Sequence, residues 1–236
     1  MPAHVFVSIF AIVALFAVFA NLKGTELHKK MGLCYFFLVI ISFFTSIAVL
    51  YLRKNLPNHE LHNIAQYSLY LENVFTLYGL ICVNLVLSGL NLTFRFKKAI
   101  KAMAIIALIF QFTLTISNSG TSSWLPIYYA AIWIVFFIHL LFKKNTFSSD
   151  LIKKHIFCFS SSGILLVLFI FTGASRRYFN EPFKTFFFSL FGIKLAFATA
   201  HAAIIFLLFY VVRLKIKITE ENPNGQPVVV VKFKKV

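Results

Sequence analysis

Acidic residues are scarce in this chain. Only 7 Asp and Glu stand against 23 Lys and Arg in 236 residues, so a carboxylate cluster holding a catalytic metal ion is not expected. The sequence also contains no HExxH, GxSxG or P-loop pattern, which mark zinc proteases, serine hydrolases and nucleotide-binding proteins. These absences argue against hydrolytic chemistry and favour a non-catalytic role, although they leave the enzyme question open.

Cysteine is scarcer still, with 3 residues. Cys34, Cys82 and Cys158 fall in three separate apolar stretches, and no CxxC or Cys/His spacing accompanies them. Neither a structural zinc site nor a disulfide framework is therefore indicated. We expect all three thiols to act as small buried hydrophobic groups.

Apolar residues are what the chain has in excess. They make up 60% of it and include 31 Phe, whereas charged residues make up 13%, about half of what a soluble domain carries. The net charge of +16 lies in short clusters between apolar runs, and the aromatic residues lie inside those runs. This pattern does not support nucleic-acid binding and indicates that lipid is the main solvent.

Seven apolar stretches are long enough to cross a bilayer, which takes about 20 residues. They cover residues 3–22, 31–52, 67–92, 99–117, 124–142, 155–174 and 186–212. The first lacks the positive start of a signal peptide, and we interpret it as a retained span. The sequence therefore predicts an all-α bundle of about seven transmembrane helices over residues 1–213, followed by a basic tail over 214–236.

Charges in the loops predict the orientation of this bundle. Seventeen Lys and Arg fall in one alternating set of loops and the tail, five fall in the other set, and Lys194 lies within the last span. Because basic loops remain in the cytoplasm, the N-terminus is predicted outside and the C-terminus in the cytoplasm. In the tail, alternation over 215–219, a turn pattern over 222–225 and a β-branched run over 227–233 predict a short β-hairpin.

Few ionisable groups lie at membrane depth, and each is a functional candidate because burying it in lipid is costly. The candidates are Glu72 in the third span together with Lys194 and His201 in the seventh. Lys194 and His201 are seven residues apart and share a helix face. The opposite face carries small residues, which suit close helix contact: Gly192, Ala196, Thr199 and Ala203. A pairing of Lys194 with Glu72 would serve either structure or a proton or substrate relay.

A second hypothesis concerns haem. His139 and His201 each lie 15 residues from the outer end of their span, or about 22 Å deep, and two imidazoles can ligate a b-type haem iron. The structural alternative has one histidine bonded across helices and the other at the inner interface. Polar residues of the third and fourth spans, including Asn84, Gln111 and Thr115, are interpreted as helix–helix contacts.

A short motif in the first cytoplasmic loop carries a family resemblance. Lys23-Gly-Thr-Glu-Leu-His28-Lys-Lys-Met-Gly32, with His4 before it and Lys154-His155 later, resembles a bacterial family of multispanning predicted membrane proteins of unknown function. Leu33 stands where most members have arginine. The resemblance implies a multispanning fold in the bacterial cytoplasmic (inner) membrane and marks His4, His28, Gly32 and His155. A plainer role is that His28 and His155 stabilise helix ends.

These observations favour a non-catalytic integral membrane protein, either an accessory subunit of a larger membrane complex or a homo-oligomer. Two other functions stay open at this point. One is an electron-transfer protein carrying haem b on His139 and His201. The other is a small transporter or proton-conducting protein that uses Glu72, Lys194 and His201.

Overall fold

The computed structural model describes eight stretches of the chain: residues 2–21, 25–54, 65–91, 97–117, 124–142, 148–178, 190–219 and 228–232. Within them, side chains are described for 6–21, 25–48, 76–90, 98–117, 127–142, 150–168, 195–196 and 198–214. His4, Glu72 and Lys194 thus lie in helices, but their side chains are outside the described residues, as is the expected turn over 222–225.

Seven helices and one two-stranded sheet make up these stretches. They are α1 (Pro2–Ala20), α2 (Glu26–Lys54), α3 (Ala65–Asn91), α4 (Lys97–Ser117), α5 (Trp124–Phe142), α6 (Ser148–Tyr178), α8 (Leu190–Arg213), β1 (Lys215–Thr219) and β2 (Val228–Lys232). The strands pair antiparallel, with Lys215 opposite Lys232 and Thr219 opposite Val228, as the tail pattern predicts. Each helix overlaps one of the seven predicted stretches.

Two helices, α2 and α6, begin more than one turn before their apolar stretches, and both differences have a physical reason. α2 starts at Glu26 because the Oγ1 of Thr25 accepts a hydrogen bond from the backbone N–H of His28, which caps the first turn. α6 starts at Ser148 with Asp150 in its first turn, where a negative charge favours the helix N-terminus. Hydropathy detects only the apolar part of each helix, so it misses these polar first turns.

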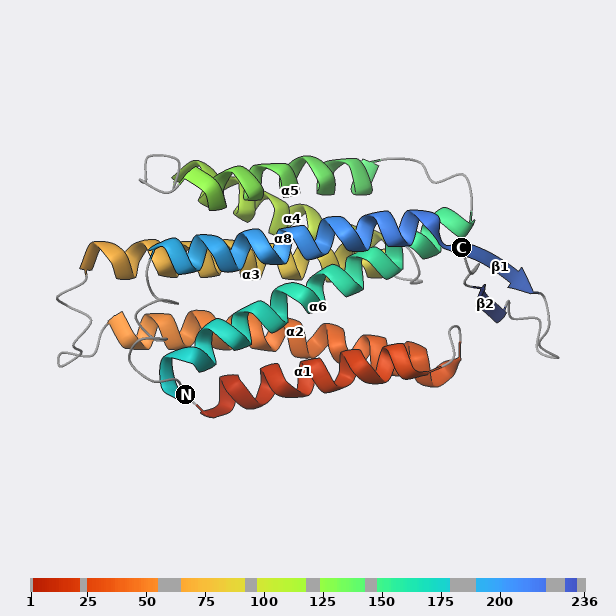
Figure 1. The fold of residues 1–236 in the computed structure, drawn as a ribbon, viewed down its shortest axis with the longest axis horizontal. Coiled ribbons are helices and arrows are strands. Elements are labelled where there is room, and N and C mark those ends of the chain that lie inside the picture. The colour runs from red at the N-terminus through yellow and green to blue at the C-terminus, as the bar shows by residue number, and fades with distance from the viewer. Residues whose placement is uncertain are drawn as a thin grey trace.

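The helices run up and down the bundle. α1, α3 and α8 run toward the end where the hairpin lies, and α2 and α6 run back (Figure 1). α1 begins at the opposite end from the one where α8 finishes. Three described helices contain stretches long and apolar enough to cross a membrane, Glu26–Ala48, Lys98–Ser117 and Asp150–Leu168. Shorter apolar stretches lie in the others: Phe6–Ala20, Thr76–Leu90, Ile127–Phe142 and Ala198–Arg213.

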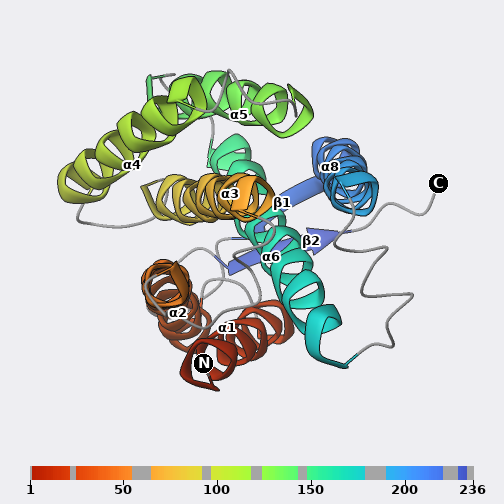
Figure 2. The same ribbon diagram turned by 90° about the vertical axis from the view of Figure 1, so that its left-hand side faces the viewer.

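Helix α3 is the centre of the bundle, with α4 and α5 on one side, α1 and α2 on the other, and α6 beside it (Figure 2). Every side chain from Leu80 to Leu90 is buried, so this part of α3 has no lipid-facing or water-facing side. Gly89 permits a close approach of α6, because a Cβ there would lie 2.7 Å from the ring of Phe159 and 3.2 Å from the Cβ of Cys158. The position of α3 decides which polar groups become interior.

The outer surface of the described helices is apolar. Large hydrophobic side chains are exposed along α1, α2, α4, α5 and α8, and Phe206 reaches 75% exposure. Buried polar groups, in contrast, are collected between the helices. Water would favour the opposite distribution, so this arrangement suits a lipid surround.

One cysteine departs from expectation. Cys82 and Cys158 are buried, whereas Cys34 is exposed on α2. The prediction was wrong for Cys34 because an apolar helix at the edge of the bundle also has an outward face. An apolar sequence therefore does not distinguish the protein interior from the lipid side.

Candidate functional site

A buried polar contact is built around His201 in the middle of α8. His201 is 7% exposed, and its Nε2 accepts a hydrogen bond of 3.2 Å from the indole N–H of Trp133 on α5. The ring of Tyr129 stacks on the imidazole at a centroid distance of 3.9 Å, and that of Tyr78 on α3 meets it edge-on at 5.6 Å. Three helices thus meet at one imidazole, surrounded by aromatic rings.

This contact fixes the charge of His201. An indole can only donate, so Nε2 must be unprotonated to accept its hydrogen bond, and the ring carries its proton on Nδ1. An imidazolium would place two N–H groups against each other in an apolar interior. The arrangement can hold α5 and α8 together through the hydrogen bond between Trp133 and His201.

The haem hypothesis requires His201 and His139 to face one iron. His139 is exposed on α5, six residues after Trp133 and therefore on a different side of that helix. His201 already presents Nε2 to Trp133 and one ring face to Tyr129. This arrangement does not fit a haem iron ligated by both imidazoles.

The face that α8 packs against the bundle also differs from expectation. Ala200, His201 and Ile204 are buried, whereas Thr199 and Ala203 are exposed. The small-residue face was predicted to be the packing face, which is wrong for these two residues. His201 turns inward, where it finds the N–H donor of Trp133, and Thr199 and Ala203 are left on the outside.

Polar residues of the third and fourth helices do form helix–helix contacts. The Nδ2 of Asn84 on α3 donates to Oε1 of Gln111 on α4 at 2.9 Å, and the Nε2 of Gln111 donates to the carbonyl of Ala130 on α5 at 3.2 Å. Thr115 instead bonds within its own helix, to the carbonyl of Gln111 at 2.7 Å. Asn84 and Gln111 therefore join three helices.

A second histidine site lies at the end of the bundle near the hairpin, and it brings together two residues of the family-like motif. His28 on α2 and His155 on α6 have ring centroids 6.5 Å apart in an edge-on arrangement. Both rings are half-buried. They are far apart in sequence, and they meet because α2 and α6 both start at this end of the bundle and run in the same direction (Figure 1).

Each of the two rings is held by a backbone carbonyl of another helix. The Nδ1 of His28 lies 3.0 Å from the carbonyl oxygen of Val18 on α1, and the Nδ1 of His155 lies 3.1 Å from that of Gly89 on α3. A carbonyl accepts only, so Nδ1 is the protonated nitrogen in both rings. Both carbonyls belong to the last turn of a helix, where a side-chain donor from a neighbouring helix can bond to them.

Two opposing effects act on positive charge at the His28–His155 pair. A positive ring at a helix C-terminus is favoured by about 0.3–1 kcal/mol. Two positive rings 6.5 Å apart repel each other by about 2.5 kcal/mol at an effective dielectric constant near 20. One proton on the pair is therefore favoured by its surroundings, whereas two are not.

The same end shows a wider pattern of basic side chains against helix C-termini. The Nζ of Lys153 on α6 donates to the carbonyl of Val212 in the last turn of α8 at 3.0 Å. The Nζ of Lys101 on α4 lies 5.1 Å from the ring centroid of Phe142, the last residue of α5. Helices that start at this end thus place a basic side chain on helices that finish there.

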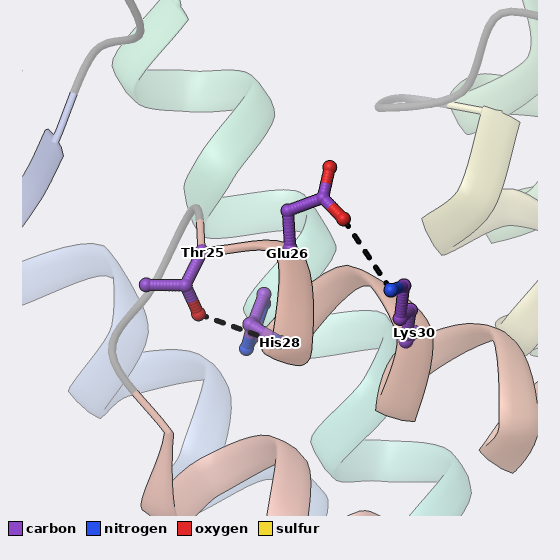
Figure 3. Close-up of polar contacts among 4 residues, drawn as sticks. All are labelled: Thr25, Glu26, His28 and Lys30. Carbon is purple, nitrogen blue, oxygen red and sulfur yellow. Dashed lines mark hydrogen bonds and ion pairs between the residues drawn. The ribbon is translucent and has the colours of Figure 1, made fainter. Parts of the chain in front are cut away.

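The motif around His28 is a helix start (Figure 3). Thr25 caps the helix, and Glu26 in the first turn makes an exposed ion pair with Lys30 at 3.5 Å. Gly32 has nothing within 4 Å of where a Cβ would be, so packing does not require a glycine there. The side chain of His4 lies outside the described residues.

Sequence reasoning missed the residues that surround the histidines. Trp133 and Tyr129 were absent from the candidates, although their spacing of four puts them on one face of α5. Tyr35, whose hydroxyl lies 2.7 Å from the Oγ of Ser162, was missed as well. An aromatic residue that carries an N–H or O–H within an apolar stretch is a signal for such contacts, because its polar atom needs a partner.

No clustered metal site complements the two histidine sites: the side chains described here contain no group of three or more His, Cys, Asp or Glu suited to a metal ion. Comparison with known proteins finds no matching family model, no matching curated protein and no matching solved structure. Any function must therefore be inferred from the chain itself.

Proposed function

We propose that this chain is a seven-span protein of the bacterial cytoplasmic membrane, with its N-terminus outside, and that it serves as a non-catalytic subunit of a larger membrane assembly. The proposed membrane location is supported by the inverted distribution of side chains. Large apolar groups such as Phe206 and Phe209 face outward, while Asn84, Gln111 and His201 find partners inside.

The orientation is supported by the basic end of the bundle. His28, Lys101 and Lys153 lie there, at the end predicted to be cytoplasmic, together with the tail strands. Positive residues in short loops remain on the cytoplasmic side during insertion. An odd number of passes also agrees with α1 starting and α8 finishing at opposite ends of the bundle (Figure 1).

Reporter fusions test this topology. A reporter that is active only in the cytoplasm should work after residues 23, 96, 145 and 236, and fail after residues 58, 120 and 182. Activity after residue 58 or silence after residue 236 would contradict the orientation. An even number of passes would place the two termini on the same side.

The proposed role as a subunit rests on two small residues, Thr199 and Ala203, that face outward from α8. Thr199 and Ala203 are one turn apart and exposed, so another transmembrane helix can approach the backbone of α8 closely at this position. Mass measurement of the complex extracted in mild detergent should show additional protein. Ala203→Leu should dissociate it, while Ala131→Leu, at an exposed alanine of α5, should not. A monomer with lipid alone would contradict this role.

The family resemblance of the loop motif has its own test. His28 and His155, two residues that the resemblance marks, lie in one contact between α2 and α6. If the chain belongs with that family, members should keep or lose these two histidines together. Independent variation of the two positions would remove the support.

A visible absorption spectrum tests the alternative that the protein binds haem b. Because the Nε2 of His201 accepts the hydrogen bond of Trp133, we expect the purified protein to show no haem bands when oxidised or reduced. A split band that shifts on reduction and disappears in His201→Ala would overturn this expectation.

A further inference from the structure

The half-buried pair of His28 and His155 lies at the end of the bundle near the β-hairpin, and it connects two parts of the bundle. His28 bonds within the α1–α2 hairpin, through Val18, and His155 bonds within the α3–α6 pair, through Gly89. The two rings meet edge-on across the junction between these parts. Any change in the charge of the rings therefore acts directly on how the α1–α2 hairpin is held.

Protonation leaves the anchoring bonds of both rings in place. Each Nδ1–H already donates to a carbonyl, so an added proton goes to Nε2 and both Nδ1 contacts persist. The first proton produces one imidazolium at the C-terminus of a helix, where positive charge is favoured. The second produces another imidazolium 6.5 Å from the first, in a half-buried place where the repulsion is only weakly screened.

Other charges at this end add to the repulsion. The helices that start there carry more positive than negative groups: Glu26, Lys29 and Lys30 on α2, Lys98 and Lys101 on α4, and Asp150, Lys153 and Lys154 on α6. Arg213 ends α8. Among their described side chains, α1 and α3 offer no acidic or histidine group that could offset a second proton.

We propose that His28 and His155 form a site for a single proton that joins the α1–α2 hairpin to α3 and α6, and that a second proton loosens this junction. The ligand is the proton itself. A metal ion shared by the two rings is disfavoured, because the described residues supply no third ligand and the surrounding charge is positive. The site lies at the proposed cytoplasmic face and would respond to cytoplasmic acidification. It does not require the subunit role.

Asparagine variants separate proton binding from hydrogen bonding. The side-chain amide of Asn can donate to a carbonyl from roughly the position of Nδ1, but it does not titrate. In His28→Asn and His155→Asn the carbonyl contact is retained and double protonation is impossible. His139→Asn is the matched control, because His139 is an exposed histidine on α5.

The experiment is hydrogen exchange on the full chain in lipid nanodiscs, corrected for intrinsic rates. From about pH 8 to about pH 5, exchange at residues 18–21 and 26–30 should rise about tenfold in the unmodified protein and in His139→Asn. It should change less than about twofold in the two Asn variants. A flat profile in the unmodified protein, or a full rise in both Asn variants, would overturn the proposal.

A second measurement does not depend on the variants folding. Ring nitrogen shifts of the unmodified protein, followed by NMR, should show the pair taking up protons in two steps separated by more than about one pH unit. Two rings that titrate together in one step would overturn the proposal. Since neither measurement uses a partner protein, failure here is distinguishable from failure of the subunit role.

Discussion

Two histidine sites in one bundle behave in opposite ways. At the hairpin end, His28 and His155 donate from Nδ1 to carbonyls that end helices, so either ring can be charged without losing its bond. In the middle of the bundle, His201 accepts through Nε2 from Trp133 and must stay neutral. The role of a histidine in this chain is thus decided by whether its partner is an acceptor or a donor.

Packing also differs between the two sites. His201 is enclosed by Tyr78, Tyr129 and Trp133, so its contribution to stability is mostly van der Waals contact in a closed space. The end pair is half-buried and contributes mainly by satisfying carbonyls. Substitutions in the interior should therefore cost more free energy than substitutions at the end, in an order that the following experiments can test.

The largest effect is expected for His201→Ala. It leaves a cavity among three aromatic rings and removes the acceptor of the Trp133 N–H, which should lower the free energy of unfolding by about 3 kcal/mol. His139→Ala, at an exposed position, should change it by less than about 0.5 kcal/mol. Unfolding by SDS in mixed micelles measures both, and equal losses would remove the distinction between the two histidines.

Gly89→Ala should have the next largest effect, because it disturbs the close packing of α3 against α6 beside His155. The new Cβ would lie 2.7 Å from the ring of Phe159, which itself packs against His155 at 4.6 Å, and 3.2 Å from Cys158. The expected loss is about 1–3 kcal/mol, with faster labelling of the buried Cys158 thiol. Gly32→Ala, where nothing lies within 4 Å, should be neutral or stabilising. The opposite order would show that α3 and α6 do not pack this closely.

A smaller effect is expected from Thr25→Ala at the start of α2. This change removes the hydroxyl that caps the N–H of His28, at a cost of about 1 kcal/mol. Thr25→Ser keeps the hydroxyl and should restore most of the stability. If the alanine and serine variants unfold alike in the same micelle titration, the cap does not position His28.

Glu26→Gln should have the smallest effect. Its ion pair with Lys30 is exposed on both sides, at 81% and 76%, so solvent screens it and the change should be about 0–0.5 kcal/mol. Added salt should reduce the difference further. A loss as large as that of Thr25→Ala would mean that charge, rather than capping, holds the start of this helix.

Much of the fold was predictable from sequence because long apolar stretches mark the helices. Seven helices match the seven apolar stretches, and the tail strands match the alternation after Arg213, since period and length are local properties of the chain. The contact between Asn84 and Gln111 was also foreseen in kind, because polar groups in spanning helices seek each other. The polar first turns of α2 and α6 were not, because hydropathy does not detect capping.

The candidate sites were less predictable. The pairing of His139 with His201 was inferred from depth alone, but depth does not give the direction of a side chain around the helix. The family-like motif marked His28 and His155 without indicating that they touch. The outward position of Thr199 and Ala203 was also unexpected, because lipid and protein interior are equally apolar and sequence does not tell them apart.

The sequence by itself determined where the helices lie along the chain and how apolar they are, because these follow from local apolar length and periodicity. Only the tertiary structure decided which face of each helix is inside. It placed α3 at the centre, turned His201 toward Trp133 and brought His28 to His155. The physical reason is that a side chain's environment is set by neighbouring helices, and helices distant in sequence become neighbours only when the bundle packs.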